Sequence, residues 1–158
     1  MKESLLEIFV RESQKVGNKN YFLTRSDLRG MPEKNKALFQ YVPSLNNFST
    51  YEISEREIPS AMVEVDYGIA ETGTCVIQCA DEQIRLATSL AETLSLVLPA
   101  SRIVPCSYDL IDQMEEWTEK NNYIAFITGA SRTADIEREL AIGVHGPAEL
   151  IIYIITDL

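Results

Sequence analysis

The sequence predicts an α/β fold, with a mostly parallel sheet flanked by helices. Residues 123–128 and 150–156 are nearly continuous apolar runs of strand length, which is typical of strands buried on both faces. Residues 133–142, which separate them, have a helical pattern that ends at Gly143. A strand, a helix and a strand in this order form a right-handed βαβ unit with parallel strands. Because both faces of these strands are apolar, helices are expected on both sides of the sheet.

The first element, at residues 4–15, is predicted to be an amphipathic helix. Ser4 and Glu7 stand in capping-box positions, apolar residues recur at helical spacing, and Gly17 follows the last turn. We expect the whole chain to pack as one domain, because 158 residues suffice for one core and are too few for two of ordinary size.

The next part of the chain has weaker patterns. Residues 18–43 lack a clear period and predict an irregular connection, with at most a short helix near residues 34–40. Residues 49–54 alternate between apolar and polar side chains and predict a strand. Residues 55–64 predict a helical turn that Pro59 interrupts.

A glycine-centred turn marks the middle of the chain. Two short β-prone segments lie within residues 67–80, on either side of Thr72-Gly73-Thr74. Glycine at this position allows a tight turn or a close approach of the backbone to a ligand. The elements expected after it are a short helix or loop at residues 85–92, a buried strand at 93–98, a connector at 99–105 and a helix at 109–119.

Composition excludes several classes of function. The chain has 14 Lys and Arg against 24 Asp and Glu, a formal charge of −10, which disfavours binding to nucleic acids and to anionic membranes. The longest apolar stretch, residues 150–155, is far shorter than the roughly 20 residues that span a bilayer. With free cysteines and no signal-peptide pattern, the expected location is the cytoplasm.

The cysteines and the single histidine fit no zinc or iron–sulfur site. The spacing of Cys75, Cys79 and Cys106 fits neither a zinc knuckle nor an iron–sulfur motif, and Cys75 and Cys79 are predicted to be core residues. His145 is the only histidine. We therefore expect neither a metal nor a cofactor in this chain.

The segment at residues 127–137 opens like the nucleotide loop of short-chain dehydrogenases, in which a strand ends in Thr-Gly. Thr133 and Asp135 occupy the positions where that loop needs further glycines. Their side chains would block and repel a pyrophosphate, so we reject NAD binding.

The same loop predicts an anion site. Gly129 precedes the hydroxyls of Ser131 and Thr133 and the guanidinium of Arg132, at the expected amino terminus of a helix. These donors suit a carboxylate or a phosphate. The alternative is structural, with Ser131 or Thr133 capping the helix and Arg132 paired to Asp135.

His145 and Glu71 are the candidate catalytic residues. His145, within residues 143–147, could act as a general base or an anion ligand, or could be a loop residue bonded to the backbone. A regular helix at residues 133–142, about 15 Å long, would separate His145 from the Gly129 loop unless the loop folds back or a neighbouring subunit completes the site, as in a homo-oligomer. Glu71 could be a binding or catalytic carboxylate or an exposed turn residue.

Four segments together resemble the LUD domain family, most closely its lactate utilization protein C type (LutC, also called YkgG). They are Ile-Ala-Glu-Thr-Gly-Thr at residues 69–74, Pro-Ala-Ser-Arg-Ile-Val-Pro at 99–105, Ile-Thr-Gly-Ala-Ser-Arg-Thr-Ala-Asp-Ile-Glu at 127–137 and Gly-Val-His-Gly-Pro at 143–147. The resemblance covers residues 49–158 and implies a NagB/RpiA/CoA-transferase-like fold. Residues 1–48 form an amino-terminal helix and irregular segment that pack with it.

Within this family pattern Ala130 replaces a proline, which implies a less rigid loop. The candidate ligand-binding residues are Thr72, Gly73, Thr74, Gly129, Ser131, Arg132, Thr133, Asp135, His145 and Gly146.

The resemblance implies a place in a three-protein system that oxidises L-lactate to pyruvate in bacteria, with the iron–sulfur clusters in partner proteins. The first hypothesis is an accessory component that binds a small carboxylate or phosphate, or docks on the iron–sulfur partners through an apolar patch at residues 20–42. The second is an enzyme of the sugar-phosphate isomerase or acyl-transferase type, with Glu71 or His145 as base and Arg132 holding the anion. The third is a small-anion sensor.

Overall fold

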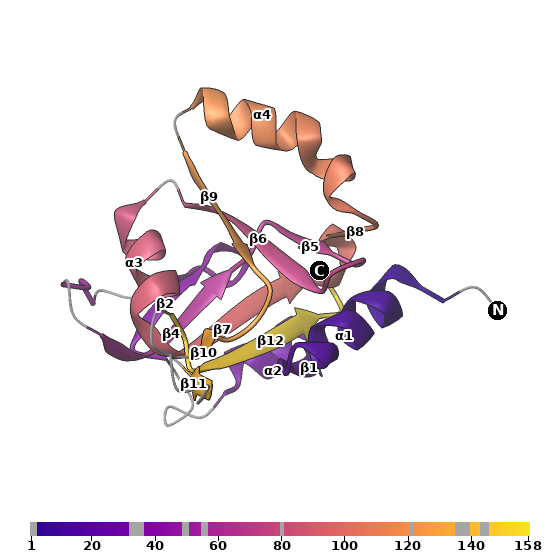
Figure 1. Cartoon of the computed structure of the whole chain (residues 1–158). Coiled ribbons are helices and arrows are strands. Elements are labelled where there is room, and N and C mark those ends of the chain that lie inside the picture. The colour runs from indigo at the N-terminus through magenta and orange to yellow at the C-terminus, as the bar shows by residue number, and fades with distance from the viewer. Residues whose placement is uncertain are drawn as a thin grey trace.

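The computed structural model describes residues 3–31, 37–48, 51–54, 57–79, 81–120, 122–134, 140–142 and 146–158. These residues form a six-stranded sheet, a four-stranded sheet and a two-stranded ribbon, with helices on both faces of the larger sheet (Figure 1). The predicted α/β class with a mostly parallel sheet is confirmed.

The central sheet has the strand order β1-β12-β7-β4-β2-β3, and every neighbouring pair is parallel except β2 and β3. Its strands are β1 (Lys19–Leu23), β2 (Phe39–Val42), β3 (Asn47–Phe48), β4 (Ile58–Glu64), β7 (Ala91–Pro99) and β12 (Glu149–Ile155). The predicted buried strands at residues 93–98 and 150–156 are confirmed as β7 and β12, which lie side by side in the middle of the sheet.

Two cores sandwich this sheet. On one face, α1 (Leu5–Lys15) and α3 (Glu82–Leu90) pack with the second sheet, and Phe9, Ile84 and Leu96 belong to this core. On the other face, the short helix α2 (Arg25–Arg29) and a 3₁₀ turn at Pro43–Leu45 cover a smaller cluster, which includes Leu28 and Met62.

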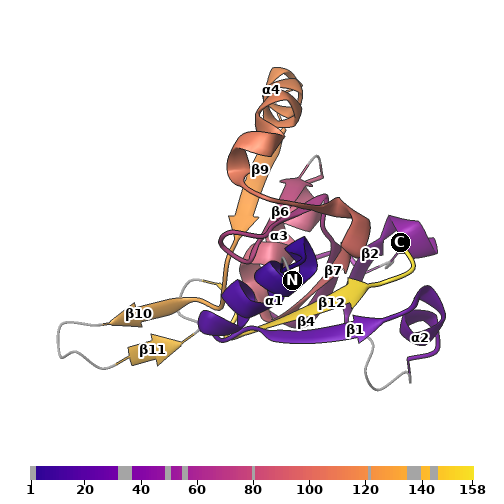
Figure 2. The same ribbon diagram turned by 90° about the vertical axis from the view of Figure 1, so that its right-hand side faces the viewer.

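The second sheet has the order β8-β5-β6-β9. Its strands are β5 (Tyr67–Ile69), β6 (Thr74–Cys79), β8 (Ile103–Val104) and β9 (Tyr123–Ile127). Helix α4 (Ile111–Glu119) packs on its outer side through Trp117. The ribbon of β10 (Arg132–Ala134) and β11 (Leu140–Ile142) is antiparallel and projects from the rest of the molecule (Figure 2).

Several local predictions are confirmed. The capping box of α1 is formed: the Ser4 backbone N–H donates to Glu7 Oε2 at 2.7 Å, and the Glu7 N–H donates to Ser4 Oγ at 3.2 Å. Gly17 follows the helix with φ +87°. The two β-prone segments around Gly73 pair as the antiparallel strands β5 and β6, and Cys75 and Cys79 are buried. Residues 109–119 contain α4, and the short helix expected at residues 85–92 is α3, which ends at Leu90, so that residues 91–92 already belong to β7.

The expectations for residues 18–64 are largely wrong. The supposed irregular connection contains β1, α2 and β2, and Phe39 begins a strand where a helix was expected. Residues 51–54 are not in a strand, and residues 58–64 form β4 rather than a helical turn. Residues 34–36, 49–50 and 55–56 lie outside the described residues. Pro59 is tolerated because it stands near the start of its strand.

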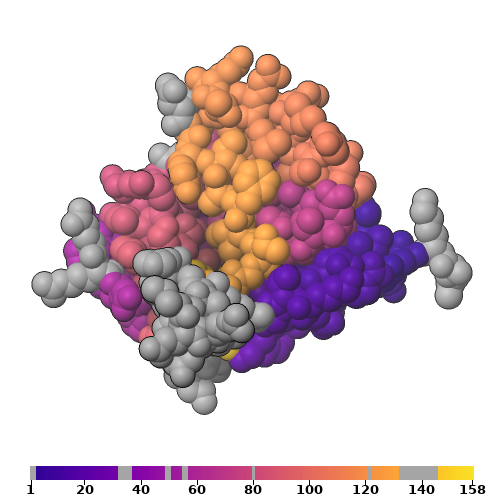
Figure 3. Space-filling model, in the orientation of Figure 1, coloured from indigo at the N-terminus to yellow at the C-terminus, as the bar shows by residue number. Residues whose placement is uncertain are grey.

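The predicted βαβ unit is also wrong. β9 runs antiparallel to β6 in the second sheet, whereas β12 lies in the central sheet. Residues 132–134 and 140–142 are extended, although the segment is rich in helix-forming residues, because pairing overrides local propensity. β9 is an edge strand and is not buried on both faces: Tyr123 and Phe126 are 56% and 50% exposed, and its side chains reach the surface in Figure 3.

Within the described part of the chain, no helix combines the length and the apolar character needed to cross a bilayer.

Candidate functional site

The two loops that carry the most distinctive sequence motifs meet in the structure. The backbone N–H of Ser131 donates to the carbonyl oxygen of Pro147 at 2.9 Å. A Cβ atom on Gly146, which has φ +143°, would lie 3.4 Å from the Cβ of Ser131. We call this contact between residues 128–131 and 146–147 the loop junction.

The regular helix that would separate these loops is not formed: residues 132–134 and 140–142 are extended and pair as β10 and β11, so the two loops meet. His145 itself lies outside the described residues. The predicted helix cap at Ser131 or Thr133 is also wrong, because β10 begins there and no helix does. The junction stands at the amino end of the parallel strands, next to the start of β12 at Glu149.

Threonine hydroxyls join the junction to the Gly73 turn. Thr128 Oγ1 lies 2.9 Å from Thr74 Oγ1, and Thr72 Oγ1 donates to Thr74 Oγ1 at 2.8 Å. Thr74 is buried, so its hydroxyl needs these partners. The structure thus brings together two groups of predicted site residues that are about fifty positions apart in the chain.

Asn18, which the sequence analysis did not identify, connects the loop junction to α1 by hydrogen bonds. Its Nδ2 donates to the Thr128 carbonyl oxygen at 2.7 Å and to Ser13 Oγ at 3.0 Å. Because a carbonyl oxygen only accepts, these contacts orient the amide. Asn18 Oδ1 is buried and has no hydrogen-bond partner among the described residues. The only sequence signal was a polar residue directly after the helix-ending Gly17.

Gly73 and Gly129, two of the three site glycines, differ in their surroundings. Gly73 has φ +63°, and an added Cβ would lie 2.3 Å from the backbone nitrogen of Ser13. Gly73 thus forms the predicted turn, and the group that it approaches closely is the backbone of α1. At Gly129 an added Cβ would lie 3.4 Å from the Val16 carbonyl oxygen, an ordinary contact distance.

Glu71 has structural partners of its own. Its Oε1 accepts from the Ser107 N–H at 3.3 Å, and its backbone N–H donates to the Pro105 carbonyl oxygen at 3.1 Å. Its carboxylate is exposed. These contacts are those of a turn residue that ties the β5–β6 connection to the segment after β8.

The remaining predicted residues are only partly described. Arg132 and Thr133 lie in β10, where the backbone is described and the side chains are not. Asp135 and His145 lie outside the described residues, so the proposed pairing of Arg132 with Asp135 does too.

Comparison with known proteins bears on the same segments. The family model described as "LUD domain" matches residues 57–155, which include all four motif segments. The chain belongs to the LUD domain family. The resemblance inferred from those segments is thereby confirmed.

Relatives of this LUD chain include proteins named Lactate utilization protein C. That of Geobacillus thermodenitrificans is 32% identical over 130 residues, which cover 80% of this chain and 53% of the relative. That of Geobacillus kaustophilus is 36% identical over 96 residues, which cover 58% and 40%. The Escherichia coli protein named Uncharacterized protein YkgG is 27% identical over 163 residues, which cover 96% and 69%. The chain thus spans about half the length of the curated lactate utilization proteins it matches.

A solved structure shows the same fold. The crystal structure of a DUF162 family protein from Deinococcus radiodurans superposes with a TM-score of 0.65, over 98% of this chain and 100% of that chain. At 13% identity this likeness concerns the fold alone.

The LUD chain has a second polar cluster, at the opposite edge of the central sheet, that the sequence analysis missed. Glu64, the last residue of β4, is buried and accepts from Arg102 Nη1 at 3.0 Å and from the N–H and Oγ of Ser44 at 2.8 and 2.6 Å. Nearby, Asp66 Oδ2 accepts from the Gln78 N–H at 2.7 Å. Arg102 lies within the motif at residues 99–105, which was the available signal.

This carboxyl-edge cluster lines a cavity of about 270 Å³ together with Tyr41 and Asp81. Burial raises the pKa of Asp66, and the charge of Glu64 adds to the rise, although the Gln78 hydrogen bond and Arg102 oppose it. Burial and the same carboxylates also raise the pKa of Tyr41, which keeps its hydroxyl protonated. Within the described residues, no group of three His, Cys, Asp or Glu side chains could hold a metal ion.

Proposed function

We propose that this chain is an accessory component of bacterial L-lactate oxidation to pyruvate and binds a small carboxylate at the loop junction. The observation that carries the proposal is the hydrogen bond from Ser131 to Pro147, which joins two family motifs. The names of the relatives that match up to 80% of the chain at 32% identity support the pathway.

The chemistry of the junction suits a carboxylate. The hydroxyls of Thr128 and Ser131 supply hydrogen-bond donors, and Arg132 directly follows Ser131 in the chain. A guanidinium binds a carboxylate through two parallel hydrogen bonds. We propose Arg132 as the cationic partner of the ligand.

In this proposal the iron–sulfur clusters remain in partner proteins. Cysteine binds such clusters as a thiolate. Burial raises the pKa of the Cys75 thiol strongly and that of Cys79 to about 11, so both thiols are protonated at neutral pH. Cys106 alone is partly exposed.

Exposed apolar side chains support docking to such partners. Tyr21 and Phe22 of β1, an edge strand, are 48% and 54% exposed, and Tyr21 stacks on Tyr153 at a centroid distance of 5.8 Å. They lie in the stretch of residues 20–42 that was predicted to dock. Edge strands with exposed aromatic side chains are common contact surfaces.

Calorimetric titration of the purified chain tests ligand binding. L-Lactate and pyruvate should bind, and Arg132→Ala should weaken binding about tenfold with little change in the melting temperature. Arg85→Ala, which removes an equal charge from an exposed pair with Glu82, is the matched control. A loss of stability without a change in affinity would contradict the site. The purified chain alone should not oxidise lactate, and turnover without partners would contradict the accessory role.

A second candidate, an enzyme of the sugar-phosphate isomerase or acyl-transferase type, is favoured by the carboxyl-edge cavity. Open α/β sheets hold ligands at the carboxyl ends of their strands. Asp66, whose pKa burial raises, would act there as an acid or base. Turnover of a sugar phosphate or acyl donor that Asp66→Asn abolishes would favour this candidate over the accessory role.

A further inference from the structure

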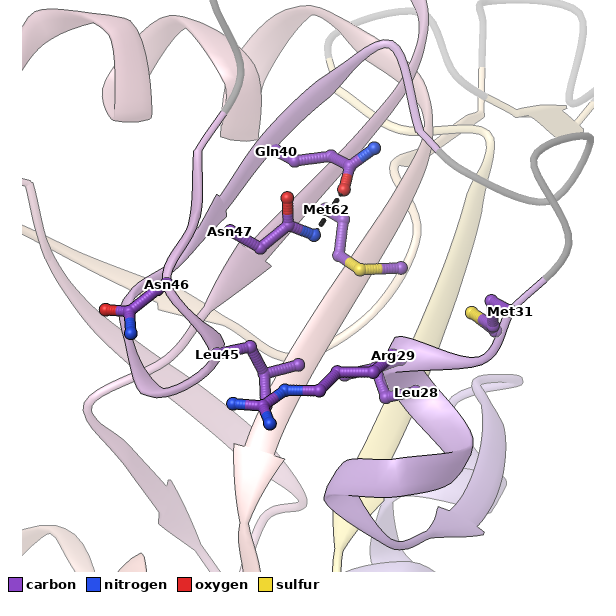
Figure 4. Close-up of a pocket in the computed structure, with 8 residues that line it drawn as sticks. All are labelled: Leu28, Arg29, Met31, Gln40, Leu45, Asn46, Asn47 and Met62. Carbon is purple, nitrogen blue, oxygen red and sulfur yellow. Dashed lines mark hydrogen bonds between the residues drawn. The ribbon is translucent and has the colours of Figure 1, made fainter.

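We propose that a separate pocket, between α2 and the β2–β3 turn, binds a monocarboxylate with a short apolar tail. The pocket has a volume of about 260 Å³ (Figure 4). The residues that decide its chemistry are Leu28, Arg29, Leu45, Asn47 and Met62.

The floor of the pocket is apolar and fixed. Leu28, Leu45 and Met62 are all buried, and they belong to one core cluster on the face of the central sheet that α2 covers. Helix α2 is held by a capping box between Thr24 and Asp27. Because these side chains are already packed, they lose little conformational entropy when a ligand binds. The burial of the ligand's aliphatic group against them is favourable.

The rim of the pocket is polar and has one charge. Arg29 is exposed, extends across the pocket towards Leu45 in Figure 4, and makes no ion pair with any described residue. Asn47 Nδ2 donates to Gln40 Oε1 at 2.5 Å, and Gln40 Nε2 donates to the Ala37 carbonyl oxygen at 2.8 Å, so the amide wall is also fixed.

The charge of the pocket lining favours an anionic ligand. The chain has a formal charge of −10, yet none of the described residues that line this pocket is acidic, and Arg29 gives the lining a positive charge. A guanidinium that makes no ion pair with a described residue is suited to a carboxylate, which it binds with two hydrogen bonds. The carboxyl-edge cavity, by contrast, is lined by the carboxyl groups of Glu64, Asp66 and Asp81 together with the guanidinium of Arg102.

The size and the polarity of the pocket restrict the class of ligand that it can bind. The pocket, of about 260 Å³, has room for an acid larger than acetate or lactate. A second carboxylate or a phosphate on the apolar floor would lose its hydration without a partner. The expected ligand is therefore an aliphatic or aromatic monocarboxylate with about four to six carbon atoms.

This site is independent of the proposed function. The pocket lies on the carboxyl side of β1 and β2, whereas the loop junction stands at the amino end of β12. The two sites share a carboxylate chemistry and differ in the tail that they accept. Arg29→Gln and Arg132→Ala should therefore each weaken the binding of a different ligand.

Calorimetry with 4-methylpentanoate as the probe tests the pocket. Acetate, which has the charge without the tail, and 4-methylpentanamide, which has the tail without the charge, should each bind about tenfold more weakly. Arg29→Gln should lower the affinity for 4-methylpentanoate about tenfold. Arg25→Gln removes the same charge from the same helix outside the pocket, and should change the affinity less than twofold. Equal effects of the two variants, or equal affinities for the acid and its amide, would overturn the proposal.

A nuclear magnetic resonance titration of the unaltered chain keeps the test valid if Arg29→Gln does not fold. Addition of 4-methylpentanoate should shift the side-chain amide signals of Gln40 and Asn47. Shifts confined to Ser131 and its neighbours would place the probe at the loop junction and refute the pocket. L-Lactate binding that Arg132→Ala weakens and Arg29→Gln does not would separate the proposed function from this site.

Discussion

A Cβ atom on Gly73 would lie 2.3 Å from the backbone nitrogen of Ser13. The β5–β6 turn is thus pressed against α1, and the helix occupies the space that the glycine leaves. The same stretch of α1 and the residues after it support the loop junction, because Asn18 bonds to both Ser13 and Thr128. The position of α1 therefore determines the geometry of the proposed carboxylate site.

Gly73→Ala should destabilise the fold by about 3 kcal/mol, because it combines a positive φ with overlap against a helix backbone. Urea unfolding measures the effect. Gly129→Ala is the matched control, since an added Cβ there makes only ordinary contacts, and it should cost less than about 1 kcal/mol. Similar losses for both variants would contradict the contact between the turn and α1.

Asn18→Ala should cost about 1–3 kcal/mol, because it leaves the Thr128 carbonyl oxygen and Ser13 Oγ without their donor. Thermal unfolding measures the loss, and L-lactate affinity should fall as the junction loosens. Asn20→Ala serves as the control: Asn20 Nδ2 donates to the Asn18 carbonyl oxygen at 3.4 Å and Asn20 Oδ1 accepts from Ser13 Oγ at 3.2 Å, both longer than the bonds of Asn18, so the loss should be smaller. An unchanged melting temperature for Asn18→Ala would show that the junction does not depend on it.

Asp66→Asn should stabilise the folded chain at neutral pH. Because burial raises the pKa of Asp66 in the folded state, its ionisation opposes folding, and this penalty grows as the pH rises from the unfolded value, about 3.9, through the folded value. Below about pH 4 the variant and the original chain should be equally stable. Glu116→Gln should have the opposite sign, since the Lys120 hydrogen bond lowers the pKa of Glu116. A stability difference at Asp66 that does not vary with pH would refute the burial argument.

One thiol of the native chain should react with a thiol reagent, and three should react after unfolding. Cys75 and Cys79 are buried in the core between the sheets, whereas Cys106 is partly exposed. Absorbance with an aromatic disulfide reagent counts the thiols. Cys106→Ser should remove the fast reaction, and two or more fast thiols in the native chain would contradict the burial of β6.

The sequence alone determined the features that depend on neighbours a few residues away. The capping box of Ser4 and Glu7 and the turn at Gly73 follow from local backbone chemistry. β7 and β12 were recognisable because strands in the centre of a parallel sheet are apolar on both faces. The four motif segments, at residues 69–74, 99–105, 127–137 and 143–147, together identified the family.

Only the tertiary structure decided which strands pair and therefore where the site lies. β4 is a strand because it pairs with β2 and β7. β9 belongs to the second sheet because it pairs with β6. The extended residues 132–134, the meeting of Ser131 with Pro147 and the ion pair of Glu64 with Arg102 depend on contacts between distant segments. Helix caps and turns are local and visible in the sequence, whereas strand pairing is set by partners far away in the chain.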